Sequence, residues 1–385
     1  MKIVYYSSLP FTDCDFPLIK GLQEEHEIYY VLPINSFQLK SSLINIRKQI
    51  KKTGIFNANI YKEFNFYSKY LNLEKVFILN RPHKSVYHIK NIILIIQFIY
   101  FLFKIKPQII HFTLPPNNLE LLLYLFFRKK MVLTLHDPFL HSGEKNITRE
   151  FYRKIAFKLI PKIILLNQSQ KIDFIKHYKI STKKIFINQL GNYECINLFL
   201  NTQQKKNEQQ IIFFGRISPY KGIEYLCEAM VEVHKILPDL KCVIAGSGKY
   251  YFDISKYQNL KYILIYNRYI GMDELAKLIN NSLFTVCPYT DATQSGVIQT
   301  SLALNIPIMA TKVGGLGEKI KNGHNGILIE EKCNSKVLAD SIISLVRNHS
   351  LRETMKENIK KDNKDGESSW KQICKKYINI YNYSV

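Results

Sequence analysis

Short apolar runs alternate with longer mixed segments along most of the chain, and this alternation is the feature that most constrains the fold. In the first half, segments such as Leu119–Lys129 and Thr148–Leu159 are typical of helices and separate the apolar runs. Alternating strands and helices predict a parallel sheet with helices on both faces. The strands that we expect here are Ile3–Tyr6, Glu27–Val31, Gln108–Phe112, Met131–Leu135, Lys162–Leu166 and Lys184–Asn188.

The alternation stops once and then starts again. Asn201–Gln210 (NTQQKKNEQQ) is polar and has no apolar periodicity, so we place an interdomain linker at or just before it. The sequence therefore predicts an α/β protein of two Rossmann-like, doubly wound parallel-sheet domains, 1–195 and 196–367, with a ligand cleft between them. The strands expected after the linker are Ile211–Phe214, Cys242–Ala245, Tyr262–Ile265, Phe284–Cys287 and Ile308–Ala310.

Large apolar residues recur at near-helical spacing in the last segment, 368–385. They predict a terminal helix that packs on the body of the protein. These residues are Trp370, Ile373, Tyr377, Ile380 and Tyr381.

The net charge of +23 is concentrated in the first half, where residues 1–200 carry +16 and residues 201–385 carry +7. Such an excess suits an anionic substrate, an anionic membrane surface or a polyanionic partner. Nucleic acid is the weakest of these partners because no nucleic-acid motif accompanies the charge. The seven cysteines form no CxxC pair and no zinc spacing, which is typical of reduced thiols in a cytoplasmic protein.

The most apolar stretch, Ile92–Phe103, is too short for a membrane span, which needs about 20 residues. We expect it to be a buried helix ahead of a strand. The N-terminus leads directly into an apolar strand, so no signal peptide is expected. A peripheral membrane contact through a basic, aromatic helix stays open.

The first chemical motif is IIFFGRISPYKG, residues 211–222. An apolar strand ends at Gly215, which lets a ligand approach the backbone. Arg216 follows with a guanidinium that grips phosphate oxygens, and Lys221 adds a point charge at the start of a helix. Together with the helix N-terminus this arrangement suits a diphosphate. The alternative is a strand–turn–helix with two solvated cations.

The second motif spans residues 286–318 and places a small polar loop, Asp291–Gly296, between a strand and a helix. The helix start at Ser295 and Gly296 offers N–H donors to an anion. The Gly314-Gly315 pair allows a tight turn close to a ligand. An ordinary βαβ unit with glycine-rich loops is the alternative.

The third motif is VLTLHDPFLHSGE, residues 132–144. Its strand delivers His136 and Asp137 to the carboxyl end of the sheet, where open α/β sheets bind ligands. An imidazole there suits a sugar hydroxyl or a phosphate, so we favour a functional over a structural His136. His141 is expected to be a loop residue.

An ordered set of motifs resembles the family-4 retaining glycosyltransferases. The motifs are FGRISPYKG, AGSG (245–248), PYTDATQSGV, the 307–318 segment with ATKVGGLGE, and the GxNGILI pattern (323–329). The resemblance covers nearly the whole chain and is most specific from 211 to 330. It implies the GT-B fold, a C-terminal helix that crosses back onto the first domain, and no metal ion or other cofactor. It also implies a nucleotide-sugar donor held mainly by the second domain.

Carried over by motif, Arg216 and Lys221 would hold the donor diphosphate, and His136 would face the transferred sugar. The acceptor would be a glycan or a lipid-linked molecule, as in cell-surface polysaccharide assembly. The other donor residues implied by the resemblance are Gly215, Gln294, Ser295, Gly296 and Val297 around the sugar and phosphates, and Asn267, Tyr269 and Ile270 near the base.

The chain departs from the family pattern at two places. Ala292 and Thr300 stand where many members have two glutamates. Either Thr300 or Gln299 replaces the contact that the second glutamate usually makes with the donor ribose, or that contact is lost. The first loop, Ser7–Pro17, has no paired glycines. It carries Asp13 and Asp15 instead, which we expect to meet the acceptor together with Asp137.

These observations predict retaining glycosyl transfer. The sequence places no carboxylate that we can assign as the nucleophile, and this fits a same-face attack assisted by the leaving phosphate. Two other classes remain open. One is a non-catalytic protein that binds sugar nucleotides or glycans, and the other is a GT-B sugar-nucleotide epimerase.

Overall fold

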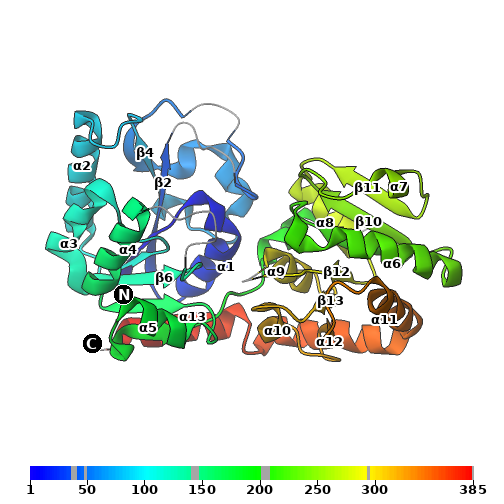
Figure 1. The fold of residues 1–385 in the computed structure, drawn as a ribbon. Helices are drawn as coiled ribbons and strands as arrows, with labels where there is room; N and C mark the ends of the chain where they lie inside the picture. Colours follow the sequence, from blue (N-terminus) through cyan, green and yellow to red (C-terminus); the bar gives the residue numbers. More distant parts are fainter. Residues whose placement is uncertain (36–40, 47–49, 140–146, 201–208, 293–294, 384–385) are drawn as a thin grey trace. The chain divides into compact units, whose positions relative to one another are not determined.

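The computed structural model describes residues 1–35, 41–46, 50–139, 147–200, 209–292 and 295–383 (Figure 1). The chain forms two compact units, Met1–Leu190 with Trp370–Val385 and Gly191–Ser369. Each unit is built on one mainly parallel sheet, so the prediction of two α/β units is confirmed. Most of the expected linker, residues 201–208, lies outside the described residues.

The first unit contains an eight-stranded sheet of order β3-β4-β2-β1-β5-β6-β7-β8, in which only the β3–β4 pair is antiparallel among the described strands. The order along the sheet reverses between β1 and β5, and open α/β sheets bind ligands beside such a reversal. The strands are β1 (Lys2–Tyr6), β2 (Glu27–Asn35), β3 (Gly54–Asn57), β4 (Val76–Arg81), β5 (Ile109–Phe112), β6 (Met131–Leu135), β7 (Lys162–Leu165) and β8 (Ile185–Ile187).

Helices of the first unit include α1, which begins at Thr12 and so corrects the expected loop Ser7–Pro17. Buried apolar side chains such as Phe16 and Ile19 hold this segment on the sheet as a helix. The helices are α1 (Thr12–Leu22), α2 (Ile89–Ile105), α3 (Leu122–Phe127), α4 (Ile147–Leu159), α5 (Lys171–Tyr178) and α13 (Trp370–Asn382).

Helix α2 contains the most apolar stretch of the chain and is buried on only one side. Leu94, Phe98 and Leu102 are at most 4% exposed, whereas Ile96 is 56% and Tyr100 is 71% exposed. The expectation of a buried helix is therefore wrong for its outer face. Lys90, Gln97 and Lys104 recur every seven residues and are exposed, so these polar residues mark the side of the helix that faces away from the core.

The second unit contains a six-stranded parallel sheet of order β11-β10-β9-β12-β13-β14, which reverses between β9 and β12. The strands are β9 (Gln210–Phe214), β10 (Lys241–Gly246), β11 (Ile263–Asn267), β12 (Thr285–Cys287), β13 (Ile308–Thr311) and β14 (Gly326–Ile329). The helices are α6 (Ile223–Ile236), α7 (Ser255–Gln258), α8 (Met272–Asn280), α9 (Gly296–Ala303), α10 (Leu316–Lys319), α11 (Ser335–Arg347) and α12 (His349–Asp365).

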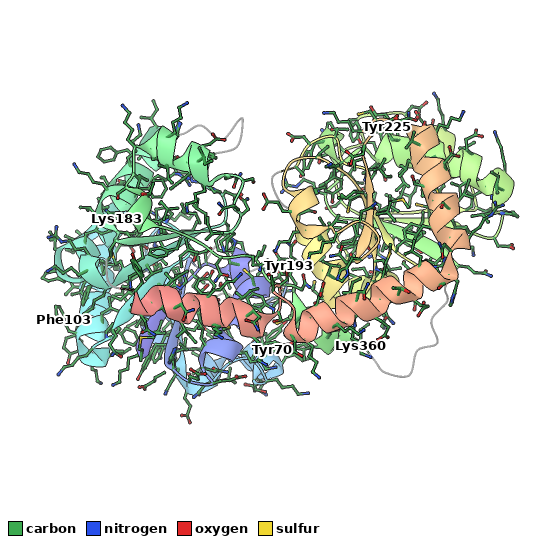
Figure 2. All side chains as sticks on the ribbon, turned by 90° about the horizontal axis from the view of Figure 1, so that it is seen from below. Tyr70, Phe103, Lys183, Tyr193, Tyr225 and Lys360 are labelled. Carbon is green, nitrogen blue, oxygen red and sulfur yellow. The ribbon has the colours of Figure 1, made fainter. Side chains whose placement is uncertain are left out.

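Helix α13 lies across the first unit and packs on α1 (Figure 2). Its Tyr381 hydroxyl is 2.6 Å from Nδ1 of His111, a buried residue of β5, and the Thr134 hydroxyl is 2.7 Å from Nε2. Burial lowers the pKa of His111 to about 3, so its ring is neutral. One ring nitrogen therefore donates a hydrogen bond to one of these hydroxyls, and the other nitrogen accepts a hydrogen bond from the second hydroxyl. Lys162 also donates to the backbone carbonyl of Tyr381, at 2.7 Å.

We expect Tyr381→Phe to lower the free energy of unfolding by about 1–3 kcal/mol, because it leaves a buried imidazole nitrogen without its partner. Urea unfolding measures this loss. Tyr383→Phe is the matched control, since Tyr383 is 52% exposed near the same end of the chain. Equal stability of the two variants would show that the buried hydrogen bond does not hold α13.

Candidate active site

Two loops meet in the second unit at the carboxyl ends of β9 and β12, where the strand order of the sheet reverses. The first, residues 215–222, joins β9 to α6, and its Tyr220 carbonyl accepts a 2.9 Å hydrogen bond from the backbone N–H of Thr290 in the second loop. Gly222 has a φ of 63°, and a Cβ added there would lie 2.0 Å from the Pro288 carbonyl oxygen. The close approach of the loops therefore requires glycine at this position.

Lys221 is the unusual side chain of this region, because it is a cation that is only 7% exposed. No described residue forms an ion pair or hydrogen bond with its ammonium. Its Nζ instead lies 3.7 Å from the ring centroid of Tyr289, a cation–π contact. Burial lowers the pKa of Lys221 to about 8; the neighbouring Cys287 raises it, and Arg216 lowers it further. A buried ammonium without a carboxylate is the arrangement expected for a site that awaits an anion.

Arg216 places a second cation beside Lys221. Its side chain is exposed, and within the described part of the chain no carboxylate pairs with it. It follows Gly215, whose φ of 123° turns the backbone at the end of β9. Two cations without a counter-ion in the described part of the chain thus lie at the sheet edge where ligands bind.

The start of α9 forms the other side of this site. Ser295 caps the helix and is 5% exposed, and its Oγ is 3.2 Å from the hydroxyl of Tyr289. Gly296 is exposed, while Val297 lies 3.5 Å from the position of a Cβ on Gly215, so α9 and the β9 loop are in contact. Gln294 lies outside the described residues.

The two candidates for the missing glutamate have different surroundings. The hydroxyl of Thr300 donates to the Gly296 carbonyl at 2.7 Å and is therefore used within α9. Gln299 is 2% exposed, and its Oε1 has no hydrogen-bond partner among the described residues. Both side-chain oxygens can therefore still accept a hydrogen bond, and that of Gln299 is the one without a partner among the described residues.

The expected base-binding residues follow β11. Asn267 is exposed and bonds the backbone of Gly248 through both side-chain atoms, at 3.2 and 3.1 Å. Tyr269 is 71% exposed and Ile270 is half-buried. Between them Arg268 pairs with Glu274, a contact that sequence reasoning missed.

A pocket of about 360 Å³ opens in the first unit at the carboxyl ends of β5 and β6. His136 lines it and stacks on Phe11, with ring centroids 3.9 Å apart and planes at 10°. Burial lowers the pKa of His136 to about 4, so the imidazole is neutral near pH 7. Asp137, Asn117, Arg149 and Tyr152 also line the pocket, which combines aromatic rings with polar groups.

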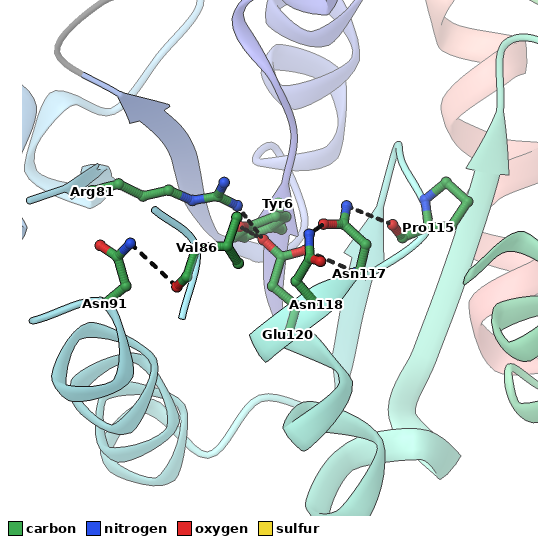
Figure 3. Close-up of polar contacts among 8 residues, drawn as sticks. All are labelled: Tyr6, Arg81, Val86, Asn91, Pro115, Asn117, Asn118 and Glu120. Atoms are coloured by element: carbon green, nitrogen blue, oxygen red, sulfur yellow. Dashed lines mark hydrogen bonds and ion pairs between the residues drawn. The ribbon is translucent and has the colours of Figure 1, made fainter. Parts of the chain in front are cut away.

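Glu120 holds the loop after β5 that lines this pocket, and sequence reasoning missed it (Figure 3). Its buried carboxylate accepts from Tyr6 at 2.6 Å, from Arg81 at 3.3 Å and from the backbone of Asn117 at 3.2 Å. Asn118 has a φ of 50° and accepts from Tyr152 at 2.9 Å. The Asn-x-x-Glu spacing of 117–120 is a capping-box signal that could have found this loop.

The two aspartates of α1 have different surroundings. Asp15 is fully buried and accepts hydrogen bonds from Tyr5 and Tyr30, each at 3.0 Å; burial raises its pKa to about 7. Asp13 is partly exposed and bonded by Ser42; burial raises its pKa to about 6. Of the pair, Asp13 is the one whose position still suits contact with a ligand.

The comparisons with known proteins agree with this architecture. The crystal structure of Anabaena HepE in complex with UDP and glucose matches with a TM-score of 0.66 at 14% identity, over 98% of each chain. This likeness shows that the chain has a GT-B-like fold, as predicted.

Residues 196–362 match the family model described as Glycosyl transferases group 1. The uncharacterized glycosyltransferase MJ1178 of Methanocaldococcus jannaschii is 28% identical over 282 residues, which cover 70% of this chain and 73% of that protein. The capsular polysaccharide glycosyltransferase CapM of Staphylococcus aureus is 27% identical over 57% of this chain and 61% of that protein. The chain is therefore similar to the group 1 glycosyltransferases, most directly over residues 196–362, and members of that family take a sugar from a nucleotide sugar.

Proposed function

We propose that this protein transfers a sugar with retention from a nucleoside-diphosphate sugar to a glycan or lipid-linked acceptor, on the cytoplasmic side of an anionic membrane. The observation that carries the donor assignment is the buried Lys221, whose ammonium has no carboxylate partner among the described residues and lies beside Arg216. CapM, whose name places it in capsular polysaccharide biosynthesis, supports a role in surface polysaccharide assembly.

In the proposed reaction the bond between the anomeric carbon and the β-phosphate oxygen breaks, and the acceptor oxygen bonds to the same face of that carbon. The acceptor proton passes to the departing phosphate. Arg216, Lys221 and the N–H groups at the start of α9 stabilise the charge that develops on the diphosphate. In this proposal the protein cations take the role that a metal ion has in other glycosyltransferases, so activity should survive treatment with EDTA.

The first unit contributes the pocket beside His136 in this proposal. A neutral imidazole both donates and accepts, which suits a sugar hydroxyl better than a phosphate. The stacked ring of Phe11 fixes its plane. We assign the pocket to the sugar and acceptor side of the reaction.

Thermal unfolding in the presence of UDP, GDP and ADP tests the donor assignment, because a ligand that binds only the native state raises the melting temperature. We expect one nucleoside diphosphate to stabilise the wild type and to stabilise Lys221→Gln much less. No stabilisation by any of the three would count against a donor site here.

The alternative is a non-catalytic protein that binds sugar nucleotides, which is favoured by Ala292 and Thr300 at the positions of the usual glutamates. Substrate turnover distinguishes this alternative from sugar transfer. Release of nucleoside diphosphate from the matching nucleotide sugar shows catalysis. Binding of that nucleotide sugar without any release would establish the alternative.

Donor binding should depend on pH through Lys221, whose pKa of about 8 means that its ammonium is charged below pH 8 and neutral above it. Affinity for the nucleoside diphosphate should therefore be constant from pH 7 to 7.5 and weaken as the pH passes 8, by up to about tenfold at pH 9. Calorimetric titration measures this trend. Lys221→Arg should remove it, since arginine remains protonated; a trend that persists in this variant would exclude Lys221 as its source.

A further inference from the structure

We propose that the outer face of α2 and α3 is a membrane-binding surface that takes an anionic lipid bilayer. This inference rests on the proposed function, because the membrane contact would bring the first unit to a lipid-linked acceptor. The surface is defined by its exposed apolar side chains, which are Ile89, Ile93, Ile96, Tyr100 and Phe103 on α2 and Leu122, Leu125 and Phe126 on α3.

The exposed residues of α2 follow each other at intervals of three and four, so they form one face of the helix. Helix α3 continues this face, because the ring of Phe103 lies 5.8 Å from that of Phe126 and 5.1 Å from that of Phe127. Phe103 lies at the periphery of the first unit (Figure 2). Contiguous apolar surface of this kind marks an interaction site rather than scattered exposed residues.

Charge decides which partner fits this surface. The ends of the two helices carry exposed cations that have no carboxylate partner among the described residues. Segment 84–130 contains one acidic residue, Glu120, which is 9% exposed and is already bonded to Tyr6 and Arg81. Apolar and aromatic side chains bordered by cations suit the interface of an anionic bilayer. The cations are Lys90, Lys104, Lys106, Arg128 and Lys129.

The helix geometry is that of a surface contact. In the described part of the chain, no helix has the length and apolar character needed to cross a bilayer. The inner side of α2 packs Leu94, Phe98 and Leu102 into the core. Only the outer face is therefore available to lipid, and the helix would lie in the plane of the interface.

Sedimentation of the full chain with vesicles tests this proposal. We expect binding to vesicles of phosphatidylcholine with phosphatidylglycerol, weaker binding to phosphatidylcholine alone, and weakening with salt. Ile96→Gln with Leu125→Gln, at 56% and 74% exposure, should reduce partitioning about tenfold or more. The matched control is Ile172→Gln with Ile236→Gln, at 75% and 48% exposure, which should bind as the wild type does.

The charge is tested separately by Arg128→Gln with Lys129→Gln, which should also reduce partitioning about tenfold or more. The control is Lys332→Gln with Lys336→Gln, two exposed lysines of the second unit. Absence of vesicle binding by the wild type, or equal losses in the control variants, would overturn the proposal. A dimer seen by light scattering that only Ile96→Gln with Leu125→Gln disrupts, without vesicle binding, would assign the face to a second copy.

Failure of this inference is distinct from failure of the proposed function. The surface variants should keep the thermal stabilisation by nucleoside diphosphate, because they leave the second unit unchanged. A wild type that binds vesicles but no nucleoside diphosphate would refute the donor assignment and leave the membrane surface standing.

Discussion

Lys221→Met should lower the turnover of the nucleotide sugar by about 10²–10³-fold, because it removes a charge that acts on the departing diphosphate. The same change should leave the unliganded protein equally stable or more stable. Lys221 is 7% exposed, and its ammonium has no carboxylate partner in the described chain. A methionine of similar length avoids the cost of burying that charge. Opposite effects on activity and stability are the signature of a charge kept for a ligand.

The measurements are nucleoside-diphosphate release and thermal unfolding of the variant without ligand. Lys235→Met is the control, since Lys235 belongs to the same helix that follows Lys221 but is exposed and paired with Glu232 at 2.7 Å. A variant at Lys221 that loses stability and activity together would indicate a structural cation. Unchanged turnover would remove Lys221 from the proposed mechanism.

Gly222→Ala should destabilise the second unit by about 3 kcal/mol or more, because the left-handed backbone and the contact with the Pro288 carbonyl are both incompatible with a side chain. For a unit of this size the melting temperature should fall by about 6–12 °C. Circular dichroism follows the transition. The loop that carries Arg216 and Lys221 should lose its shape as well, so donor binding should weaken.

Gly323→Ala separates the cost of the left-handed backbone from the cost of the contact between the two loops. Gly323 also has a positive φ, 76°, but a Cβ there would meet nothing within 4 Å. It should cost only the backbone strain, about 1–2 kcal/mol. If both glycine variants lose the same stability, the packing of the two loops against each other is not what fixes the site.

The sequence was sufficient to predict both parallel sheets, because buried parallel strands are apolar runs between helices. It missed β3, β4 and β14. Of these strands, β3 is a four-residue edge strand that is antiparallel to β4 and carries little apolar signal, whereas β4 begins with an apolar run that was not assigned to a strand. Helix α2 was expected to be buried because of its long apolar run, although Lys90, Gln97 and Lys104 recur every seven residues along its exposed side.

The site residues show the same limit. The motifs identified Arg216 and Lys221, but the contact of Lys221 with Tyr289 depends on β9 lying beside β12, two strands far apart in the chain. Asp15 was expected to meet the acceptor, whereas Tyr5 and Tyr30 from neighbouring strands enclose its carboxylate. Such pairings arise from tertiary packing, which local sequence does not encode.

The most direct test of the donor site is an experimental structure of the full chain with the nucleoside diphosphate that stabilises it most. We predict that β-phosphate oxygens lie within hydrogen-bond distance of the Arg216 guanidinium and the Lys221 ammonium. A diphosphate bound elsewhere, with both side chains still lacking an anion, would contradict the account.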